Sequence, residues 1–293
     1  MIRKTIVISG GLGNQLFQFS FAHHLAQNFN ARIKLYAPSP KNGGRDFKLN
    51  SLCANCKHIE FVRTKRSWKI DTIFKFRNYM DNRFDGLVNR FIEKYVYVEQ
   101  NAYISEKTKQ STRLYSGYFQ NWYYVSQSLS LIDSEILNLL NSIQTMRSRS
   151  YDGVDYGVVH YRRGDLLDFR STMGLLDDAY FLNAVEVALA ESNPSLRLVI
   201  LTDDKNAGVK AFSGITEDVY GPSDIEEWEA FKIMSRARFV ITSNSTFSWW
   251  GALLCFQNGG EVYLPSPWFL NWSPDPGNAF YFPGFKTIPS EFS

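Results

Sequence analysis

The second half of the sequence alternates short apolar runs with longer segments of helical periodicity, and this alternation constrains the fold most strongly. The apolar runs cover residues 156–161, 196–202, 238–243 and 261–265, and helical patterns cover 179–191 and 225–236 between them. Strand-like runs separated by helical stretches are typical of βαβ units, whose strands form one parallel sheet. We therefore predict a doubly wound α/β domain over residues 151–293.

The start of the chain repeats this pattern. The segment "TIVISGG" combines a β-branched run with a glycine turn, a helical pattern follows it, and residues 32–38 are predicted to form a second strand. Residues 60–145 are predicted to be largely helical, and the polar, glycine-containing segment 142–157 is predicted to link two domains. The expected fold class is α/β, with Rossmann-like domains over 1–150 and 151–293 that face a cleft.

Charge and cysteine content exclude several classes of protein. A net charge of +3 is too small to favour nucleic-acid binding, and no apolar run is long enough to span a bilayer. The amino terminus lacks the apolar core of a signal peptide, and three cysteines are too few for a secreted disulfide framework. We expect a soluble cytoplasmic protein. Cys53 and Cys56 have the spacing of half a zinc site, but no second pair follows, so we interpret them as structural thiols.

Polar segments follow three of the predicted strands in the second half. These segments are "HYRRGD" from His160, "TDD" from Thr202 and "SNSTFSWWG" from Ser243. Ligands of parallel sheets bind beyond the carboxyl ends of the strands. Arginine binds phosphate through paired hydrogen bonds, and the start of a helix attracts anions. Together the segments predict a diphosphate pocket. The alternative is a surface ion network beside an ordinary capped helix.

The glycine-rich segment "GGLGNQL" at residues 10–16 resembles a dinucleotide-binding turn but departs from it. Leu16 occupies the third glycine position, and the next strand ends at Ala37 instead of an acid, which argues against NAD. The glycines let a ligand approach the backbone closely, and Asn14 and Gln15 supply amides; the alternative is a plain turn into a core helix. No Asp-x-Asp motif occurs, so we expect no bound metal ion to assist the departure of a diphosphate.

The segments "GGLGNQLFQFSFAHHLA", "VVHYRRGDLL", "LVILTDD" and "SNSTFSWWGALL", in this order, closely resemble the bacterial inverting α-1,2-fucosyltransferases. The resemblance runs from about residue 7 to residue 270. It implies a B-type glycosyltransferase that moves L-fucose from GDP-β-L-fucose to O2 of a terminal β-galactoside in surface glycan synthesis such as O-antigen assembly. GDP-fucose is then a co-substrate, and no cofactor or obligatory metal is expected.

The resemblance also implies roles for individual residues. His160 matches the histidine near the guanosine, and Arg162 matches the arginine on the β-phosphate, with Arg163 supporting the phosphate or the fold. The remaining donor-binding candidates are the strand-end pair near the nucleoside, the phosphate-binding turn and the first-domain loop: Thr202 and Asp203; Asn244, Ser245, Thr246 and Phe247; Gly11, Gly13, Asn14 and Gln15.

Two assignments stay open. The family usually has an aspartate where this chain has Ala230, and Glu229 is the candidate to replace it as the partner of guanine. The general base is either Asp165, the carboxylate nearest in sequence to Arg162, or a proton relay through Asn14 or water, with Asp165 then paired to an arginine.

The first domain is expected to select the acceptor. Residues 61–97 are basic and aromatic; we interpret them as a helical face over the core, and the alternative is peripheral contact with the inner membrane leaflet or a lipid-linked glycan. Trp122 and Tyr123 are candidates for a sugar-stacking surface. Competing hypotheses are transfer of a different GDP-linked sugar, non-catalytic binding of a nucleotide sugar, and protein fucosylation, which the missing signal peptide disfavours.

Overall fold

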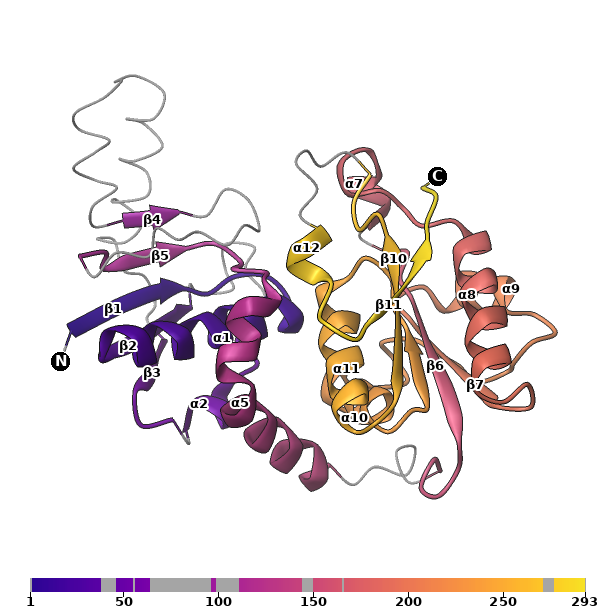
Figure 1. Ribbon diagram of the computed structural model, residues 1–293, viewed down its shortest axis with the longest axis horizontal. Helices are drawn as coiled ribbons and strands as arrows, with labels where there is room; N and C mark the ends of the chain where they lie inside the picture. Colours follow the sequence, from indigo (N-terminus) through magenta and orange to yellow (C-terminus); the bar gives the residue numbers. More distant parts are fainter. Residues whose placement is uncertain are drawn as a thin grey trace. The chain divides into compact units, whose positions relative to one another are not determined.

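The computed structural model describes residues 2–37, 46–54, 56–63, 96–98, 111–143, 150–164, 166–270 and 277–292. The chain divides into two compact units, Met1–Glu135 and Ile136–Ser293, which we describe one at a time (Figure 1). The division falls inside a helix, earlier in the chain than the predicted boundary at residue 150. No helix within the described residues is both long and apolar enough to cross a membrane.

Unit 1 contains a parallel sheet of five strands in the order β3-β2-β1-β5-β4. The strands are β1 (Ile2–Val7), β2 (Ala31–Ala37), β3 (Ile59–Arg63), β4 (Val96–Val98) and β5 (Leu114–Ser116). The helices are α1 (Leu12–Phe29), α2 (Asn50–Ala54) and α5 (Trp122–Ser142), which continues into unit 2. The predicted helical stretch 60–145 is therefore wrong in part, because β3, β4 and β5 precede or interrupt it.

Helix α1 is the central helix of unit 1 and packs against β1, β2 and β3. Its residues from Gln15 to Leu25 are all buried, and Phe21 contacts the rings of Tyr115 on β5 and Tyr124 on α5. The helix ends at Asn30, whose φ of 45° is the left-handed conformation that terminates helices. This packing fixes the direction of the helix start that follows β1.

Unit 2 contains a parallel sheet of six strands in the order β11-β10-β9-β6-β7-β8. The strands are β6 (Tyr156–Tyr161), β7 (Arg197–Thr202), β8 (Val219–Tyr220), β9 (Phe239–Ile241), β10 (Glu261–Ser266) and β11 (Lys286–Pro289). Counted from β6, this is the strand order of the Rossmann fold. The predicted α/β fold with two Rossmann-like domains is confirmed.

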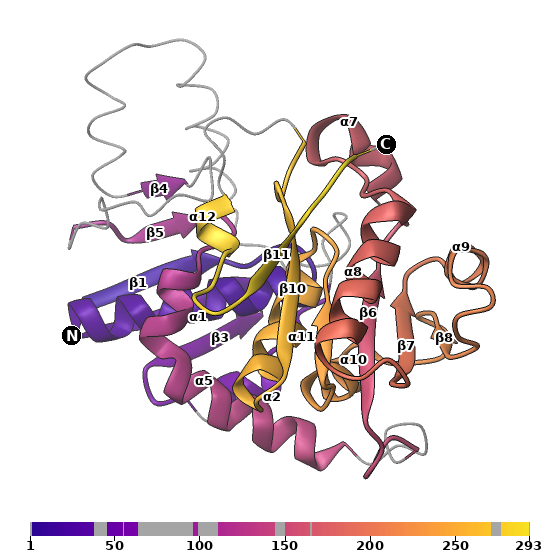
Figure 2. The ribbon, with the colours of Figure 1, turned by 45° about the vertical axis from the view of Figure 1, so that its right-hand side comes forward.

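Helices cover both faces of this sheet, which Figure 1 shows edge-on. Helices α8 (Asp178–Glu191) and α9 (Lys205–Ala211) lie on one side, and α10 (Glu227–Ser235) and α11 (Thr246–Gln257) lie on the other (Figure 2). Two short helices, α7 (Leu166–Met173) and α12 (Gly277–Phe280), follow β6 and β10. Because both faces are covered, β6 is buried along its whole length, which explains its uninterrupted apolar sequence.

Helix α11 is the most enclosed helix of unit 2. Its side chains from Ser248 to Cys255 are all buried, and Trp249 and Trp250 are both fully buried. The indole N–H of Trp249 donates a hydrogen bond to the carbonyl of Phe280 at 2.7 Å, so the ring is anchored as well as buried. These contacts fix the position of the helix start that follows β9.

Candidate active site

The loops after β6, β7 and β9 meet at the carboxyl edge of the unit 2 sheet, because β6 lies between β9 and β7. In the Rossmann order, the strands that follow β6 extend the sheet in one direction and the strands that follow β9 extend it in the opposite direction. Ligands bind at such a switch point. The predicted pocket residues of unit 2 therefore lie where the topology of the sheet favours a ligand site.

Two hydrogen bonds join the ends of β6 and β9. The Nδ1 atom of His160 lies 3.0 Å from the hydroxyl of Ser243, and a guanidinium N–H of Arg162 donates to the hydroxyl of Ser245 at 2.9 Å. Ser245 is the N-cap residue of α11 and makes no side-chain bond to the helix start. The structure thus brings together a cation with 23% of its side chain exposed and the positive end of a helix.

Asp203, directly after β7, holds the loop that carries Arg162. Its Oδ1 atom accepts hydrogen bonds from the backbone N–H groups of Arg163 at 2.7 Å and Gly164 at 3.0 Å, and Oδ2 lies 3.8 Å from Nε of Arg162. A Cβ atom at residue 164 would lie 2.6 Å from Oδ2, so only glycine allows this approach. Asp203 therefore positions Arg162, a task that its place in the sequence did not reveal.

The side chain of Arg163 makes its contacts within the fold of unit 2. Its guanidinium pairs with the carboxylate of Asp178 at the start of α8, donates to the carbonyl of Leu176, and lies 4.4 Å above the ring of Tyr161. The hydroxyl of Tyr161 donates to the same carboxylate at 2.7 Å. Of the two roles considered for Arg163, these contacts match support of the fold. No sequence signal marked Asp178, an ordinary acidic residue at a helix start.

Burial sets the charge state of His160. Removal from water, and to a smaller degree the charge of Arg162, lowers its pKa to about 3. The imidazole is therefore neutral near pH 7 and serves as a hydrogen-bonding group, not as a proton carrier. Its ring lies 5.4 Å from that of Phe247, which stacks on Phe231 of α10 at 4.5 Å.

Asn244 anchors the turn between β9 and α11. Its side-chain amide donates to the carbonyls of Met173 at 3.2 Å and Gly174 at 3.1 Å. Within the described residues its Oδ1 atom is buried without a hydrogen-bond donor. Buried acceptors are normally paired, so this atom is a candidate for contact with a bound molecule.

The other predicted donor-binding residues of unit 2 lie on β7, α10 and α11. The hydroxyl of Thr202 bonds to the backbone of Asp204 and supports the turn into α9, and Thr246 opens α11. Glu229 and Ala230 both lie on α10 and are buried, with 6% and 8% of their surface exposed. Contact of Glu229 with a guanine base stays a prediction.

In unit 1 the glycine-rich segment starts helix α1, with Gly11 as the N-cap and Gly13 and Asn14 in the first turn. The Oδ1 atom of Asn14 accepts a hydrogen bond from Gln120 at 2.8 Å. Gln15 donates both amide protons, to the carbonyls of Gly10 and Asp46, and its oxygen accepts from the N–H of Lys48. The amide of Gln15 is thus used to hold the backbone around the turn.

Two predictions fall outside the described residues. Asp165, the candidate base, is one, and most of the basic and aromatic stretch 61–97, namely 64–95, is the other. Of the candidate stacking residues, Tyr123 is 36% exposed at the start of α5. The neighbouring Tyr118, at 44% exposed, belongs to the same part of unit 1.

Comparison with known proteins identifies a family. The family model described as glycosyl transferase family 11 matches residues 2–269. An α-1,2-colitosyltransferase of Escherichia coli is 28% identical over 89% of this chain and 91% of its own. The O-antigen biosynthesis glycosyltransferase WbnK of Escherichia coli is 23% identical over 89% of this chain and 93% of its own.

Solved structures with a similar fold include two bacterial glycosyltransferases. The Escherichia coli heptosyltransferase WaaC with ADP aligns with a TM-score of 0.49 at 10% identity, covering 98% of this chain and 93% of its own. The fucosyltransferase NodZ from Bradyrhizobium aligns with a TM-score of 0.48 at 14% identity, covering 87% of this chain and 93% of its own.

Proposed function

Because the chain belongs to glycosyl transferase family 11, we propose that it moves L-fucose from GDP-β-L-fucose to O2 of a terminal β-galactoside, with inversion at the sugar. The activity class, glycosyl transfer, follows from the family. The fucosyl donor, the galactoside acceptor and the α-1,2 linkage are our proposal. O-antigen or another surface glycan is the proposed product, in line with the name of the relative WbnK.

The observation that carries the proposal is the bond between Arg162 and Ser245 across the ends of β6 and β9. It joins a guanidinium to the N-cap of α11, so two sources of positive potential converge on one point. A nucleotide diphosphate has the charge and the paired oxygens that such a site binds. Asp203 keeps the guanidinium aimed at this point through the backbone of the loop.

The proposed reaction is a single displacement. The acceptor O2 forms a bond to C1 of the fucose as the bond from C1 to the β-phosphate oxygen breaks, and the hydroxyl proton passes to a base. Negative charge grows on the departing GDP, and Arg162 with the start of α11 would stabilise it. Loss of one such donor typically costs about 3–4 kcal/mol, or roughly 100- to 1000-fold in rate.

The base remains a choice between two groups. Asp165 follows Arg162 closely and has the chemistry of a general base. The alternative is a relay through Asn14 or water, in which the amide oxygen or the water accepts the hydroxyl proton while an N–H or O–H proton passes on to solvent. Asp165→Asn separates the two, because it removes a base but leaves the relay in place.

The test is release of GDP from GDP-fucose, measured with and without a panel of β-galactosides. Arg162→Ala should lose roughly 100- to 1000-fold in galactoside-dependent release. Arg238→Ala is the matched control, because this exposed arginine pairs with Asp155 at the amino end of β9, away from the strand ends that carry the site. Equal loss in both variants, or no loss in Arg162→Ala, would refute the role of Arg162.

Two outcomes would refute the activity itself. If GDP-fucose binds but no acceptor leads to turnover, the protein is a nucleotide-sugar binder. If GDP-fucose does not bind, GDP-fucose is not the donor. The second candidate donor is GDP-colitose, favoured by the name of the colitosyltransferase relative. Competition between the two donors at equal concentration distinguishes them by the ratio of products.

The proposed acceptor is a galactose-terminated oligosaccharide, with a lipid-linked form as the alternative. If residues 61–97 contact a membrane, the protein should float with vesicles that contain anionic lipid and should dissociate at high salt. Retention in the unbound fraction at low salt would leave a soluble cytoplasmic transferase as the proposed state.

A further inference from the structure

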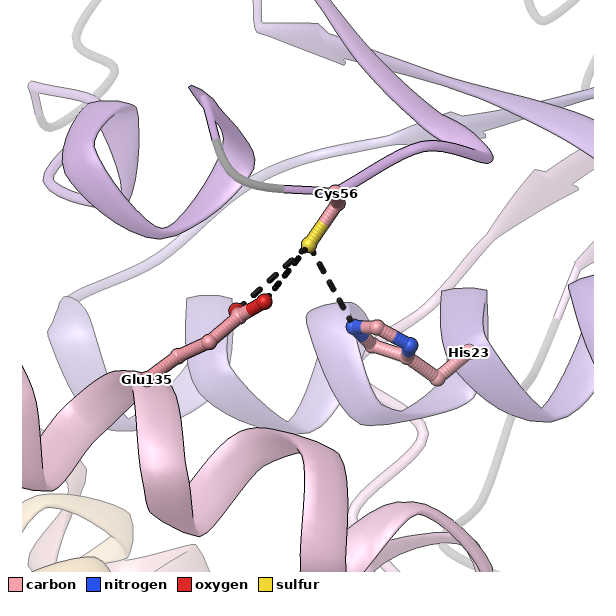
Figure 3. A group of neighbouring side chains, drawn as sticks. All are labelled: His23, Cys56 and Glu135. Carbon is pink, nitrogen blue, oxygen red and sulfur yellow. Dashed lines mark hydrogen bonds between the residues drawn. The ribbon is translucent and has the colours of Figure 1, made fainter.

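Three side chains with metal-binding atoms converge in unit 1, away from the glycine-rich turn. His23 lies on α1, Cys56 follows α2, and Glu135 lies on α5 (Figure 3). The sulfur of Cys56 lies 3.8 Å from Nε2 of His23 and 3.4 Å from each carboxylate oxygen of Glu135. The three ligand atoms, one from each residue, all lie within 4.8 Å of one another.

More hydrogen-bonding atoms surround the sulfur of Cys56 than a single thiol proton can bond. Its sulfur also lies 3.3 Å from the carbonyl oxygen of Leu52, so four electronegative atoms surround it. A thiol has one proton to donate. That proton can serve only one of the carboxylate and carbonyl oxygens around the sulfur, so at least one of these contacts has no thiol proton in it, and a cation bound between the groups would stabilise them.

The spacing of the atoms fits a tetrahedral zinc ion. With bonds of about 2.3 Å to sulfur and about 2.1 Å to nitrogen and oxygen, tetrahedral angles place sulfur about 3.5–3.6 Å from each other ligand. The observed separations of 3.8 Å and 3.4 Å lie within a few tenths of an ångström of this value. The third separation, between the His23 nitrogen and the Glu135 oxygen, is up to 4.8 Å, whereas a tetrahedral ion would hold these two atoms about 3.4 Å apart. Side-chain rotations that bring His23 and Glu135 closer together would complete the coordination.

Charge and protonation also suit a divalent ion. The imidazole of His23 has a nitrogen lone pair in its neutral form, which is the form in which histidine binds metal ions. Among the described residues no lysine or arginine forms an ion pair with Glu135. One thiolate and one carboxylate together would balance the two positive charges of the ion.

We propose that His23, Cys56 and Glu135 bind one divalent transition-metal ion of the zinc type, with solvent as the fourth ligand. The ion would tie α5 to α1 and to the segment after α2, and so would serve the stability of unit 1. On binding, Cys56 exchanges its thiol proton for a sulfur–metal bond, and the proton passes to the buffer. We propose this site as separate from the glycosyl-transfer reaction, for which the sequence predicts no obligatory metal.

Cobalt is the probe for this site, because a cobalt thiolate absorbs light whereas a zinc site is colourless. The full-length, tag-free protein is stripped with a chelator, reduced and titrated with Co²⁺ without oxygen. We expect a sulfur-to-cobalt charge-transfer band and the visible bands of a four-coordinate ion, saturating at one ion per chain and abolished by Zn²⁺. X-ray absorption of the zinc form should show one sulfur and otherwise nitrogen or oxygen ligands.

Variants identify the ligands. Cys56→Ser, His23→Gln and Glu135→Gln should each weaken cobalt binding by at least about tenfold. Cys53→Ser is the matched control, because this second, buried thiol three residues earlier is outside the ligand set, and it should leave affinity nearly unchanged. Circular dichroism of the metal-free proteins checks that each variant is folded.

Three results would overturn the proposal. No charge-transfer band in folded wild-type protein would mean that the cluster is held by hydrogen bonds alone. Two sulfur ligands, or an equal loss in Cys53→Ser, would mean that the ligand set is wrong. Unchanged affinity in Glu135→Gln, the most conservative variant, would remove α5 from the site.

Discussion

Gly164→Ala should disable the site by adding a single methyl group. The new Cβ would lie 2.6 Å from Oδ2 and 2.9 Å from Cγ of Asp203, closer than the 3.0 Å that such atoms essentially never cross. The carboxylate must move away. It then loses the hydrogen bonds that it accepts from the backbone of residues 163 and 164 at 2.7 Å and 3.0 Å. Arg162, 3.8 Å from the same carboxylate, loses its orientation with them.

The magnitude follows from these two bonds. Hydrogen bonds to a charged group contribute about 1.5–3 kcal/mol each. The Asp203 side chain is 30% exposed, and water replaces part of what is lost, so we expect about 1–3 kcal/mol for the pair. If this energy keeps the loop in its binding conformation, affinity for the donor falls by about 5- to 150-fold.

The assay is GDP binding by calorimetry, together with kcat/KM for the donor. Gly221→Ala is the matched control, because a Cβ there would lie 3.3 Å from Cβ of Lys205, a contact that a shift of a few tenths of an ångström relieves. The decisive measurement is a double-mutant cycle with Asp203→Ala. In that background the added methyl meets no carboxylate, so Gly164→Ala should cost nothing further. An equal loss in both backgrounds would refute the steric argument.

Other predictions concern the strand ends and the core of unit 2. Ser245→Ala removes the acceptor of the Arg162 N–H and should weaken GDP binding by about tenfold, whereas the same change at Ser213, an exposed loop residue, should have no effect. Lowering the pH from 6.5 toward 3 should destabilise the fold, because the unfolded chain then binds a proton that buried His160, with its pKa lowered to about 3, does not. His160 should contribute about 1.4 kcal/mol per pH unit to the slope of the unfolding free energy, and His160→Asn should make the slope shallower by that amount, as urea denaturation would show. Trp249→Phe removes one of the two hydrogen bonds that the Phe280 carbonyl accepts, the other coming from the N–H of Phe282 at 2.9 Å, and should lower the free energy of unfolding by about 1–3 kcal/mol. Urea denaturation measures this change, and an unchanged midpoint would contradict the prediction.

Strands buried on both faces could be predicted most closely from the sequence, and β1 and β2, which include partly exposed residues, were predicted as well. β6 was predicted at its observed bounds because a strand covered by helices on both sides needs an apolar residue at every position. β8 and β11 were missed because each is a short edge strand of two or four residues, with too little apolar length to form a pattern. β4 and β5, three residues each, were missed within a stretch predicted to be helical.

The candidate site was predictable in its components but not in its connections. The polar loops after β6, β7 and β9 are visible in the sequence because they follow strands of one parallel sheet. The order of the strands decides which loops touch, and local sequence does not encode that order. The hydrogen bonds of Asp203 to the loop after β6 and the pairing of Arg163 with Asp178 depend on this strand order. The same holds for His23, Cys56 and Glu135, which come from three separate segments.

The enclosure of α11 has a consequence for how this protein can evolve. Because its residues from Ser248 to Cys255 are all buried, a tilt of the helix would open voids or create clashes in a close-packed interior. Descendants of this chain therefore inherit the direction of its N–H groups almost unchanged. A lineage that acquires a new donor sugar is expected to accumulate its substitutions on the loops around Ser245 and on exposed residues of the other strand ends, while this helix diverges slowly.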